Sequence, residues 1–592
     1  MYVRIPLGLF LLLFIFSCKK ETAGPVIINC EDDMVLKAFF EDLNNQDLYI
    51  RDFEEAPETY LLFLADGSTQ EFEKACFLSV EPDPEAWLIT FTLHNEEQLI
   101  AGYGGTWQLS TVLNPSGYAP LAAELKVSAP IKGRVHIRVI GKNGNNSDVN
   151  HLAEPFATTH ELPILGLYPD FTNSIEVSYT NQAGKILKTE EIKIETAALP
   201  EDVFPEIIID VRKEDQMDGH FTLISYRGAS HGSNKPFFMD AYGDIRWYLN
   251  YESNDTLDQL GYDVGIERLA NGNYYFGNWG TDAIYEVNSY GEIVNNWPLP
   301  GYQFHHNVQE KPDGNFLVTV SKEGSLHENA KPTKEDYVLE IDRNSGAIVN
   351  EWDLKECLDE NRIVWENQLG EEVVDWFHGN AVIYDPSDNT IIVSGRHQGV
   401  VKLDYNNQVK WIMAPHLAWT TNRQGQNLNQ FLLAPLNAQG GSIEDQDIID
   451  GHENHPDFEW NWYQHAPKQM PNGNIILFDN GSIRNFDNFQ NRYSRAVEFA
   501  IDEENKTIQQ IWQYGKERGK ETFGNIVSDV DYLANKNNVL FAPGAFVDNN
   551  PEGFGGKIIE IDYTTQGVVF EAKLISSGIV FHRVERLSMY PN

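Results

Sequence analysis

The sequence predicts an all-β chain in which residues 200–592 form a six-bladed β-propeller. One observation is the composition: apolar residues make up 42% of the 592 residues and aromatic residues 12%, whereas the amphipathic periodicity of helices is scarce. The other is a strand-turn-strand unit that recurs after Pro200. Because one such unit leaves its apolar faces uncovered, several copies packed around an axis are expected to bury one another.

One half of the repeated unit is a tight turn followed by an apolar strand. Its clearest copies are Asn271-Gly272-Asn273, Asp313-Gly314-Asn315 and Asn472-Gly473-Asn474, and looser copies begin at Asp388 and Lys536. Asn-Gly and Asp-Gly suit hairpin turns because both turn positions tolerate positive φ angles. The first unit has no clean copy of this turn, which leaves five or seven blades as alternatives to six.

The other half is a hairpin that ends in a strand rich in Trp or β-branched residues. Its six copies run from Phe238 to Trp247, Ile284 to Trp297, Val338 to Trp352, Val401 to Trp411, Val497 to Trp512 and Ile558 to Phe570. Six hairpins predict six blades. The longer inserts at 354–375 and 414–460 are then expected to be loops over one face of the ring.

Two smaller β-rich regions precede the propeller. Residues 107–198 are expected to form a β-sandwich, and residues 28–105 a β-rich module of unknown role. Their strands are expected at the apolar runs Tyr60–Ala65, Trp87–Leu93, Leu125–Val127, Val135–Ile140 and Ile175–Tyr179.

The first 18 residues have the pattern of an export signal. Arg4 precedes a mainly apolar run from Ile5 to Phe16, which is too short to span a bilayer, and Ser17 and Cys18 follow it. This pattern resembles a bacterial lipoprotein signal, in which cleavage before the cysteine leaves it as the lipid-bearing N-terminus. It predicts an exported protein anchored through Cys18 to a bacterial membrane, in the periplasm or at the cell surface, with residues 19–27 as a tether. A plain signal peptide or a buried strand is the alternative.

The charge of the chain argues against a nucleic-acid partner. Asp and Glu number 88 against 44 Lys and Arg, so the net charge of -44 would repel a phosphate backbone. The same charge means that an anionic small ligand needs a local basic group inside a cleft.

The cysteines give no framework of disulfides or metal ligands. After Cys18 only Cys30, Cys76 and Cys357 remain, an odd number without metal-like spacing. A disulfide between Cys30 and Cys76 stays open.

Four short segments bring histidine or arginine to the repeat strands. They are Phe304-His305-His306-Asn307, Trp376-Phe377-His378-Gly379-Asn380, Ser394-Gly395-Arg396-His397-Gln398 and Trp462-Tyr463-Gln464-His465-Ala466. Any one of these histidines alone is adequately explained as a structural residue that bonds a neighbouring blade. Together they predict a catalytic centre, because the innermost strands of different blades converge on the central channel.

In this order, the four segments resemble the active-site motifs of the periplasmic aryl-sulfate sulfotransferase family. The resemblance covers roughly residues 107–592, and the run from Asn114 to Leu121 is similar to the small β-sandwich of that family. It implies an enzyme that transfers a sulfuryl group from an aryl sulfate to a phenol, without a nucleotide sulfate donor. Neither a cofactor nor a metal is expected.

The resemblance also implies roles for individual residues. His465 would be the nucleophile that becomes sulfated on nitrogen in a ping-pong cycle. His378 and Arg396 would bind and polarise the sulfuryl oxygens, with Asn380 nearby as a substrate-binding residue. The remaining catalytic histidine is His305 or His306.

Three other interpretations stay open beside this one. His452, Glu453, His455 and Asp457 carry ligand types that suit a divalent metal, although their loop contains Gly and Pro and no helix fixes its geometry. Aryl-sulfate hydrolysis differs only in that water replaces the phenol. A propeller without catalytic activity that binds a glycan or a protein is the third.

Overall fold

The computed structural model describes residues 26–28, 33–45, 49–83, 87–104, 107–182, 184–227, 235–258, 265–363, 368–486, 492–576 and 580–591. The signal segment with Cys18, most of the tether and Cys30 lie outside these residues. Cys76 is disulfide-bonded, and Cys357 is a buried free thiol. Among the described residues, no helix is long and apolar enough to cross a membrane.

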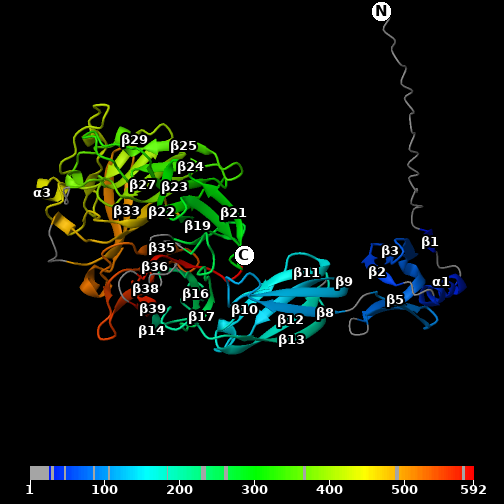
Figure 1. Cartoon of the computed structure of the whole chain (residues 1–592). Coiled ribbons are helices and arrows are strands. Elements are labelled where there is room, and N and C mark those ends of the chain that lie inside the picture. The colour runs from blue at the N-terminus through cyan, green and yellow to red at the C-terminus, as the bar shows by residue number, and fades with distance from the viewer. Residues whose placement is uncertain are drawn as a thin grey trace, which may run out of the picture.

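The chain forms three β-rich parts in sequence order, a small N-terminal module, a sandwich-like part and a ring of sheets (Figure 1). The predicted all-β class is confirmed, with few helices in the described residues. These are α1 (Asp33–Asn45), α2 (Leu354–Cys357), α3 (Gln446–Ile449) and the 3-10 turns Lys74–Cys76, Asn145–Ser147, Gln368–Gly370, Leu428–Phe431, Arg484–Phe486 and Lys516–Thr522.

The N-terminal module contains a helix that the sequence did not predict. Leu36, Phe40 and Leu43 are buried on one face of α1, at the spacing of an amphipathic helix, and Phe40 packs against Phe72 and Phe91. Two sheets complete this core. Their strands are β1 (Val26–Ile28), β2 (Ile50–Glu55), β3 (Thr59–Leu64), β4 (Thr69–Glu73), β5 (Phe77–Asp83), β6 (Leu88–Leu93) and β7 (Gln98–Gly102).

The sandwich-like part is built on one long strand. The two strands expected at Leu125–Val127 and Val135–Ile140 are parts of a single strand, β9. Its first half pairs with β8 and β11 and its second half with β10 and β12, so β9 belongs to both layers. Gly133 lies between the halves, where a Cβ atom would meet the Tyr179 ring at 2.3 Å. The strands are β8 (Gln108–Leu113), β9 (Ala123–Val139), β10 (Val149–Leu152), β11 (Ala157–Ile164), β12 (Phe171–Thr180) and β13 (Ile186–Thr196).

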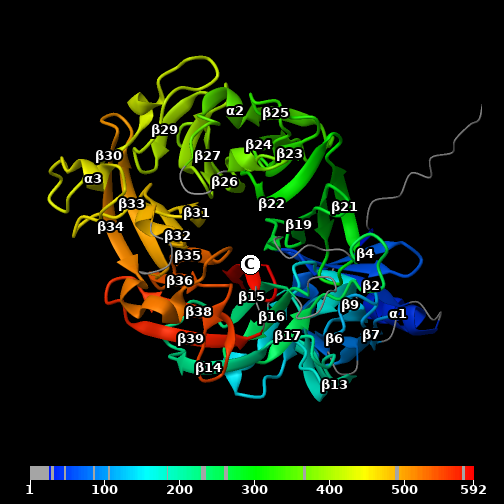
Figure 2. The ribbon, with the colours of Figure 1, turned by 60° about the vertical axis from the view of Figure 1, so that its left-hand side comes forward.

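From residue 206 onward, the described residues form six sheets around a central axis (Figure 2). The first three sheets, from the innermost strand outward, are β40 (Phe581–Arg586), β15 (Phe221–Tyr226), β16 (Phe237–Asp240) and β17 (Ile245–Tyr248); β18 (Glu267–Arg268), β19 (Tyr274–Asn278), β20 (Ala283–Val287) and β21 (Ile293–Pro298); and β22 (Tyr302–Glu310), β23 (Phe316–Lys322), β24 (Tyr337–Ile341) and β25 (Ile348–Asp353).

The other three sheets follow in chain order. They are β26 (Gly379–Asp385), β27 (Thr390–Gly395), β28 (Gly399–Asp404) and β29 (Val409–Met413); β31 (His465–Gln469), β32 (Ile475–Asp479), β33 (Arg495–Asp502) and β34 (Thr507–Tyr514), with β30 (Ala434–Leu436) at the edge; and β35 (Asp529–Leu533), β36 (Asn538–Ala542), β38 (Phe554–Asp562) and β39 (Val568–Ile575), with β14 (Glu206–Arg212) and β37 (Val547–Asp548).

The two ends of the propeller chain close the ring. The early strand β14 pairs with β39 of the last sheet, and the late strand β40 pairs with β15 of the first. The inner strand of the first sheet therefore comes from the C-terminus and not from the preceding hairpin. This explains why the first repeat has no Asn-Gly-Asn turn between its inner and second strands.

The turn asparagines have a second role beyond their backbone conformation. Gly272 has the positive φ angle of 91° that the turn requires. The side chains of Asn271 and Asn273 both donate to Oε1 of the buried Glu286, at 2.8 and 2.7 Å. Each turn is thus tied to the third strand of its own sheet.

The tryptophans that end the hairpins join neighbouring blades. Each indole N–H donates to a turn of the next blade: Trp247 to the Ser289 carbonyl at 2.8 Å, Trp297 to the Arg343 carbonyl at 2.7 Å, Trp352 to the Asp404 carbonyl at 2.9 Å, Trp411 to Glu503 Oε1 at 2.9 Å and Trp512 to the Tyr563 carbonyl at 2.9 Å. The last hairpin carries Phe570 instead, so the seam between the last and first blades has no such bond.

The sandwich-like part is held against the first blade by a buried arginine. Arg246 is fully buried, and its guanidinium donates twice to the Gly166 carbonyl, at 2.9 and 2.6 Å, and once to Asp240 at 2.9 Å. Near the C-terminus, the Tyr590 hydroxyl accepts from the Leu165 amide at 2.9 Å.

Candidate active site

Three inner strands are irregular where the histidines lie. The register of β22 shifts between Phe304 and Val308, and that of β31 shifts after His465. His306 and His378 have positive φ angles of 55° and 56°. This conformation costs about 1 kcal/mol or more for a residue with a Cβ atom, and such strain with bulges is typical of functional sites. The backbone of these inner strands is therefore irregular at the positions of the histidines.

The structure brings the predicted histidines and the arginine into one cluster. His306 Nε2 lies 3.2 Å from His378 Nε2, and the rings of His306 and His465 are 6.3 Å apart between centroids. The Arg396 amide donates to the His378 carbonyl at 3.0 Å, and its guanidinium lies 4.6 Å from the Tyr463 ring. Side chains from three blades thus meet at the channel.

The tautomer of His465 follows from its neighbours. Its Nδ1 lies 2.8 Å from Asn480 Oδ1 and 3.0 Å from the Tyr463 carbonyl, and both are acceptors. The orientation of the Asn480 amide is fixed because its Nδ2 donates to the carbonyls of Gly524 and Val527. Nδ1 of His465 must therefore carry the proton, and a neutral ring keeps the lone pair on Nε2.

The surroundings of His465 keep it neutral. Burial, with the charges of Arg396 and His378, lowers its pKa to about 3, although the hydrogen bond to Asn480 opposes the shift. Only 2% of the residue is exposed. An unprotonated Nε2 is the form in which imidazole acts as a nucleophile.

His378 is held in the opposite state by two carboxylates that the sequence did not reveal. Its Nδ1 lies 2.7 Å from Asp375 Oδ2 and 2.7 Å from Glu335 Oε2. Burial lowers the pKa of His378, but these two negative charges outweigh burial and raise it to about 9. His378 is therefore a fixed cation at neutral pH.

Glu335 connects two of the site histidines. Its Oε1 lies 2.9 Å from His305 Nε2, and its backbone carbonyl accepts from the Gly379 amide at 2.8 Å. Burial raises the pKa of Glu335, but His378 and His305 hold it well below its ordinary value. Asp375, three residues before His378, likewise has a lowered pKa because of that histidine, although burial opposes the shift.

Arg396 carries a charge that no carboxylate neutralises within the described part of the chain. Its half-buried side chain makes no ion pair there, and its buried Nε has no hydrogen-bond partner. The carboxylates of Glu335 and Asp375 are engaged with His378. A guanidinium in this state is suited to bind the oxygens of an anionic group.

Asn380 supports the strand of His465. The residue is fully buried, and its Nδ2 donates to the Gln464 carbonyl at 2.8 Å. Gln464 in turn donates to the Gly395 carbonyl at 3.0 Å. These bonds link the segments of His378, Arg396 and His465, while Asn380 Oδ1 stays without a partner among the described residues.

A further histidine, His582, lies in the same cluster and was missed from the sequence. Its ring centroid is 5.4 Å from that of His306 and 6.4 Å from that of His465. Phe581 precedes it, so it repeats the aromatic-histidine pair of the other segments. This signal was available, but β40 lies at the end of the chain, apart from the repeat to which it belongs.

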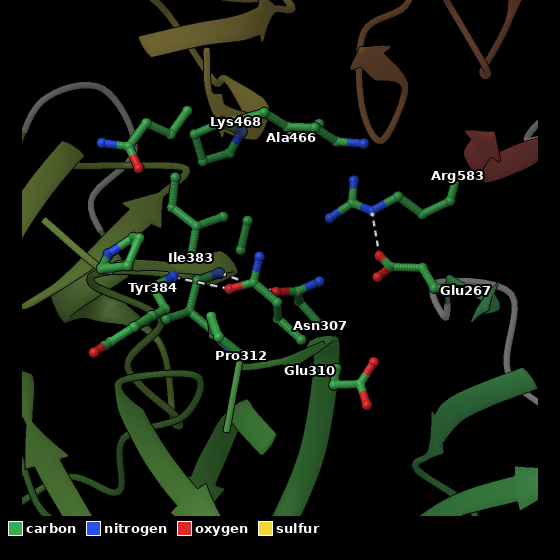
Figure 3. A pocket seen from close by; sticks show the side chains of 15 residues that line it. Glu267, Asn307, Glu310, Pro312, Ile383, Tyr384, Ala466, Lys468 and Arg583 are labelled. Atoms are coloured by element: carbon green, nitrogen blue, oxygen red, sulfur yellow. Dashed lines mark hydrogen bonds and ion pairs between the residues drawn. The ribbon is translucent and has the colours of Figure 1, made fainter. Parts of the chain in front are cut away.

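A pocket of about 400 Å³ is lined by side chains of the inner strands (Figure 3). Asn307, Ala381, Ala466 and Arg583 line it, and three of these residues directly follow His306, His465 and His582. Figure 3 shows Lys468, Arg583, Glu267 and Glu310 around this space, with Arg583 Nε 3.9 Å from Glu267.

The metal alternative at 452–457 gains no support from the geometry. In the described residues, two groups of three have donor atoms within 4.8 Å of one another, and they are His305, His306 and Glu335, and Asp375, His378 and His397. The loop at 452–457 is not among them. There, His455 Nδ1 accepts from the Asp457 amide at 3.0 Å, and the His452 ring packs against Phe486.

Comparison with known proteins agrees with the motifs. Residues 209–579 match the family described as Arylsulfotransferase (ASST), and residues 110–197 match the Arylsulfotransferase Ig-like domain. Arylsulfate sulfotransferase AssT of Escherichia coli O6:H1 is 28% identical over 79% of this chain and 90% of its own length. The protein of the same name from Lelliottia amnigena is 28% identical over 78% of this chain and 90% of its own length. The first family match spans more than half of the sequence, and the chain therefore belongs to the arylsulfotransferase family of enzymes.

Proposed function

We propose that this protein transfers a sulfuryl group from an aryl sulfate to a phenol by a ping-pong cycle through sulfated His465. The observation that carries the proposal is the fixed tautomer of His465. Asn480 Oδ1 and the Tyr463 carbonyl accept hydrogen bonds from the Nδ1–H group, which leaves the Nε2 lone pair for attack. The family membership of the chain and the aryl sulfotransfer named for its relatives support the chemistry.

In the first half of the cycle, His465 Nε2 attacks the sulfur of the aryl sulfate. The N–S bond forms while the bond from sulfur to the aryl oxygen breaks, and the aryl oxygen leaves with the electron pair. The charges of Arg396 and His378 stabilise the sulfuryl oxygens and the leaving oxygen, because charge stabilisation dominates transfers of this kind. The phenolate takes a proton from solvent, and His378 keeps its charge.

In the second half, the hydroxyl oxygen of an acceptor phenol attacks the same sulfur. The N–S bond breaks, its electrons return to Nε2, and His465 regains its neutral form. The phenol proton passes to His306, whose Nε2 lies 3.2 Å from His378 Nε2. We assign this role to His306 and not His305, because His306 contacts His378 and is buried, whereas His305 bonds to Glu335.

The test is His465→Asn, assayed with p-nitrophenyl sulfate and phenol. We expect p-nitrophenol release to fall to background, and a labelled donor given alone to label His465 in the parent only. His416→Asn is the matched control, because His416 is half-buried in the 414–460 insert and its Nε2 bonds to the Leu433 carbonyl. Release at the parent rate in His465→Asn would falsify the proposal.

The anchor at Cys18 is proposed on the N-terminal sequence alone. If lipid is attached there, the protein fractionates with membranes and Cys18→Ser releases it into the soluble fraction. Equal distribution of parent and variant would exclude the anchor without bearing on the catalytic proposal.

A further inference from the structure

His582 is a buried histidine whose ring nitrogens have no hydrogen-bond partner among the described residues. The residue is fully buried. An imidazole in this state lacks the bonds that water would give it, and a buried polar group left unsatisfied costs about 1–3 kcal/mol. A cost of this size at a fully buried position calls for a compensating role.

The position of His582 indicates what that role is. Its ring, with those of His306 and His465, forms a triangle with centroid separations of 5.4, 6.3 and 6.4 Å. The three rings come from the inner strands β40, β22 and β31. His306 and His378 are in direct contact at a centroid separation of 5.2 Å, whereas His465 and His582 stand farther apart and make no hydrogen bond. His582 therefore lies beside the proposed nucleophile without bonding to it.

We propose that His582 is a further catalytic residue, which donates a ring N–H to an oxygen of the sulfuryl group as that group passes to and from His465. This inference rests on the proposed function, because the group exists there only if His465 is sulfated. His582 would complete a set of donors in which Arg396 and His378 contribute charge and His582 contributes a neutral hydrogen bond.

The electrostatics of His582 agree with donation by a neutral ring. Burial holds its pKa well below the ordinary value, and the Arg583 charge next to it acts in the same direction. A neutral imidazole always retains one N–H, so it can donate at any pH at which the enzyme works. A neutral ring also adds no further positive charge beside that of Arg583.

The experiment compares His582→Leu with His582→Asn, two side chains of similar shape that differ in having an N–H. The measured quantity is the rate constant of the first p-nitrophenol burst from p-nitrophenyl sulfate without acceptor. Loss of one preorganised donor typically lowers a rate about 10²-fold, so we expect that loss in His582→Leu and a loss of about 10-fold in His582→Asn. His160→Asn, a change at a buried histidine of the sandwich-like part, should leave the burst unchanged.

Thermal unfolding separates donation from a merely structural role. Because His582 is unsatisfied in the folded protein, the apolar Leu should leave Tm unchanged or raise it while the burst slows. A burst in His582→Leu within two-fold of the parent, an equal loss in Leu and Asn, or a fall in Tm that accompanies the slower burst would each overturn the inference. Normal labelling of His465 in the parent shows that such a result concerns His582 and not the proposed cycle.

Discussion

The pH dependence of catalysis should be set by His378 and should move when Glu335 loses its charge. The pKa of His378 is about 9, against an ordinary value of 6.5. That difference amounts to about 3 kcal/mol in favour of the charged ring, at about 1.4 kcal/mol for each pKa unit. Glu335 and Asp375 lie at equal distances of 2.7 Å and together overcome the opposing effect of burial. In Glu335→Gln, we therefore expect the pKa of His378 to fall, because one of the two charges that raise it is gone.

The assay is kcat/KM for p-nitrophenyl sulfate with saturating phenol between pH 6 and 10, quenched in alkali before p-nitrophenol is read. The parent should lose activity as pH rises through about 9, because the neutral ring no longer stabilises the sulfuryl oxygens. In Glu335→Gln this limb should move down by at least one pH unit. A limb that stays at about 9 in the variant would refute the assignment of the charge to His378.

The control is Glu351→Gln, a change to a half-buried carboxylate of the same blade that pairs with Lys322. It should leave the alkaline limb in place.

Stability gives an independent readout. The folded pKa of His378 lies above its unfolded value, so its contribution is present below pH 6.5 and is lost as pH rises through about 9. The difference in unfolding free energy between the parent and Glu335→Gln should therefore shrink over that range.

Three further changes test other parts of the site and the fold. Asn480→Leu removes the side-chain acceptor for Nδ1 of His465, and we expect the burst rate constant to fall by about 10-fold or more because the tautomer is no longer fixed; an unchanged burst would contradict that role. Arg396→Lys keeps the charge but loses the planar fork, and kcat/KM should fall by about 10²-fold, measured with the same donor; a loss below two-fold would argue against contact with the sulfuryl group. Trp352→Phe removes one hydrogen bond between blades, so the unfolding free energy from denaturant titration should fall by about 1 kcal/mol, and kcat should stay unchanged. Phe570→Leu removes no such hydrogen bond and serves as the comparison.

The repeat was readable from sequence because local rules fix it. A turn is predicted at Asn271-Gly272-Asn273 from these three residues alone, whichever blade they belong to. Trp352 ends its hairpin as Trp247 does. From these elements follow the inner strands, and from the inner strands the convergence of His306, His378 and His465. This convergence could be predicted because each short segment carries both the fold signal and a histidine.

The residues that were missed reach the site by other routes. Glu335 precedes the third strand of its blade, at a non-glycine position with a positive φ angle of 58°, and no repeated motif marks it. His582 belongs in space to the first blade but in sequence to the last few residues, so a search for units of consecutive strands passes over it. Helix α1 was missed although Leu36, Phe40 and Leu43 have helical spacing, because the apolar runs that follow it in the module predict strands.

The closure of the ring by β40 also ties the active site to the completion of the chain. This strand ends at Arg586, six residues before the last residue of the chain, and it carries His582 into the centre. A chain that stops before Phe581 would retain most blade strands, yet the first sheet would lack its inner strand. Synthesis proceeds from the N-terminus, so the inner strand of the first blade is made after the other strands of the ring. The first blade can therefore pair fully, and His582 can join the histidine cluster, only after every other blade has been synthesised.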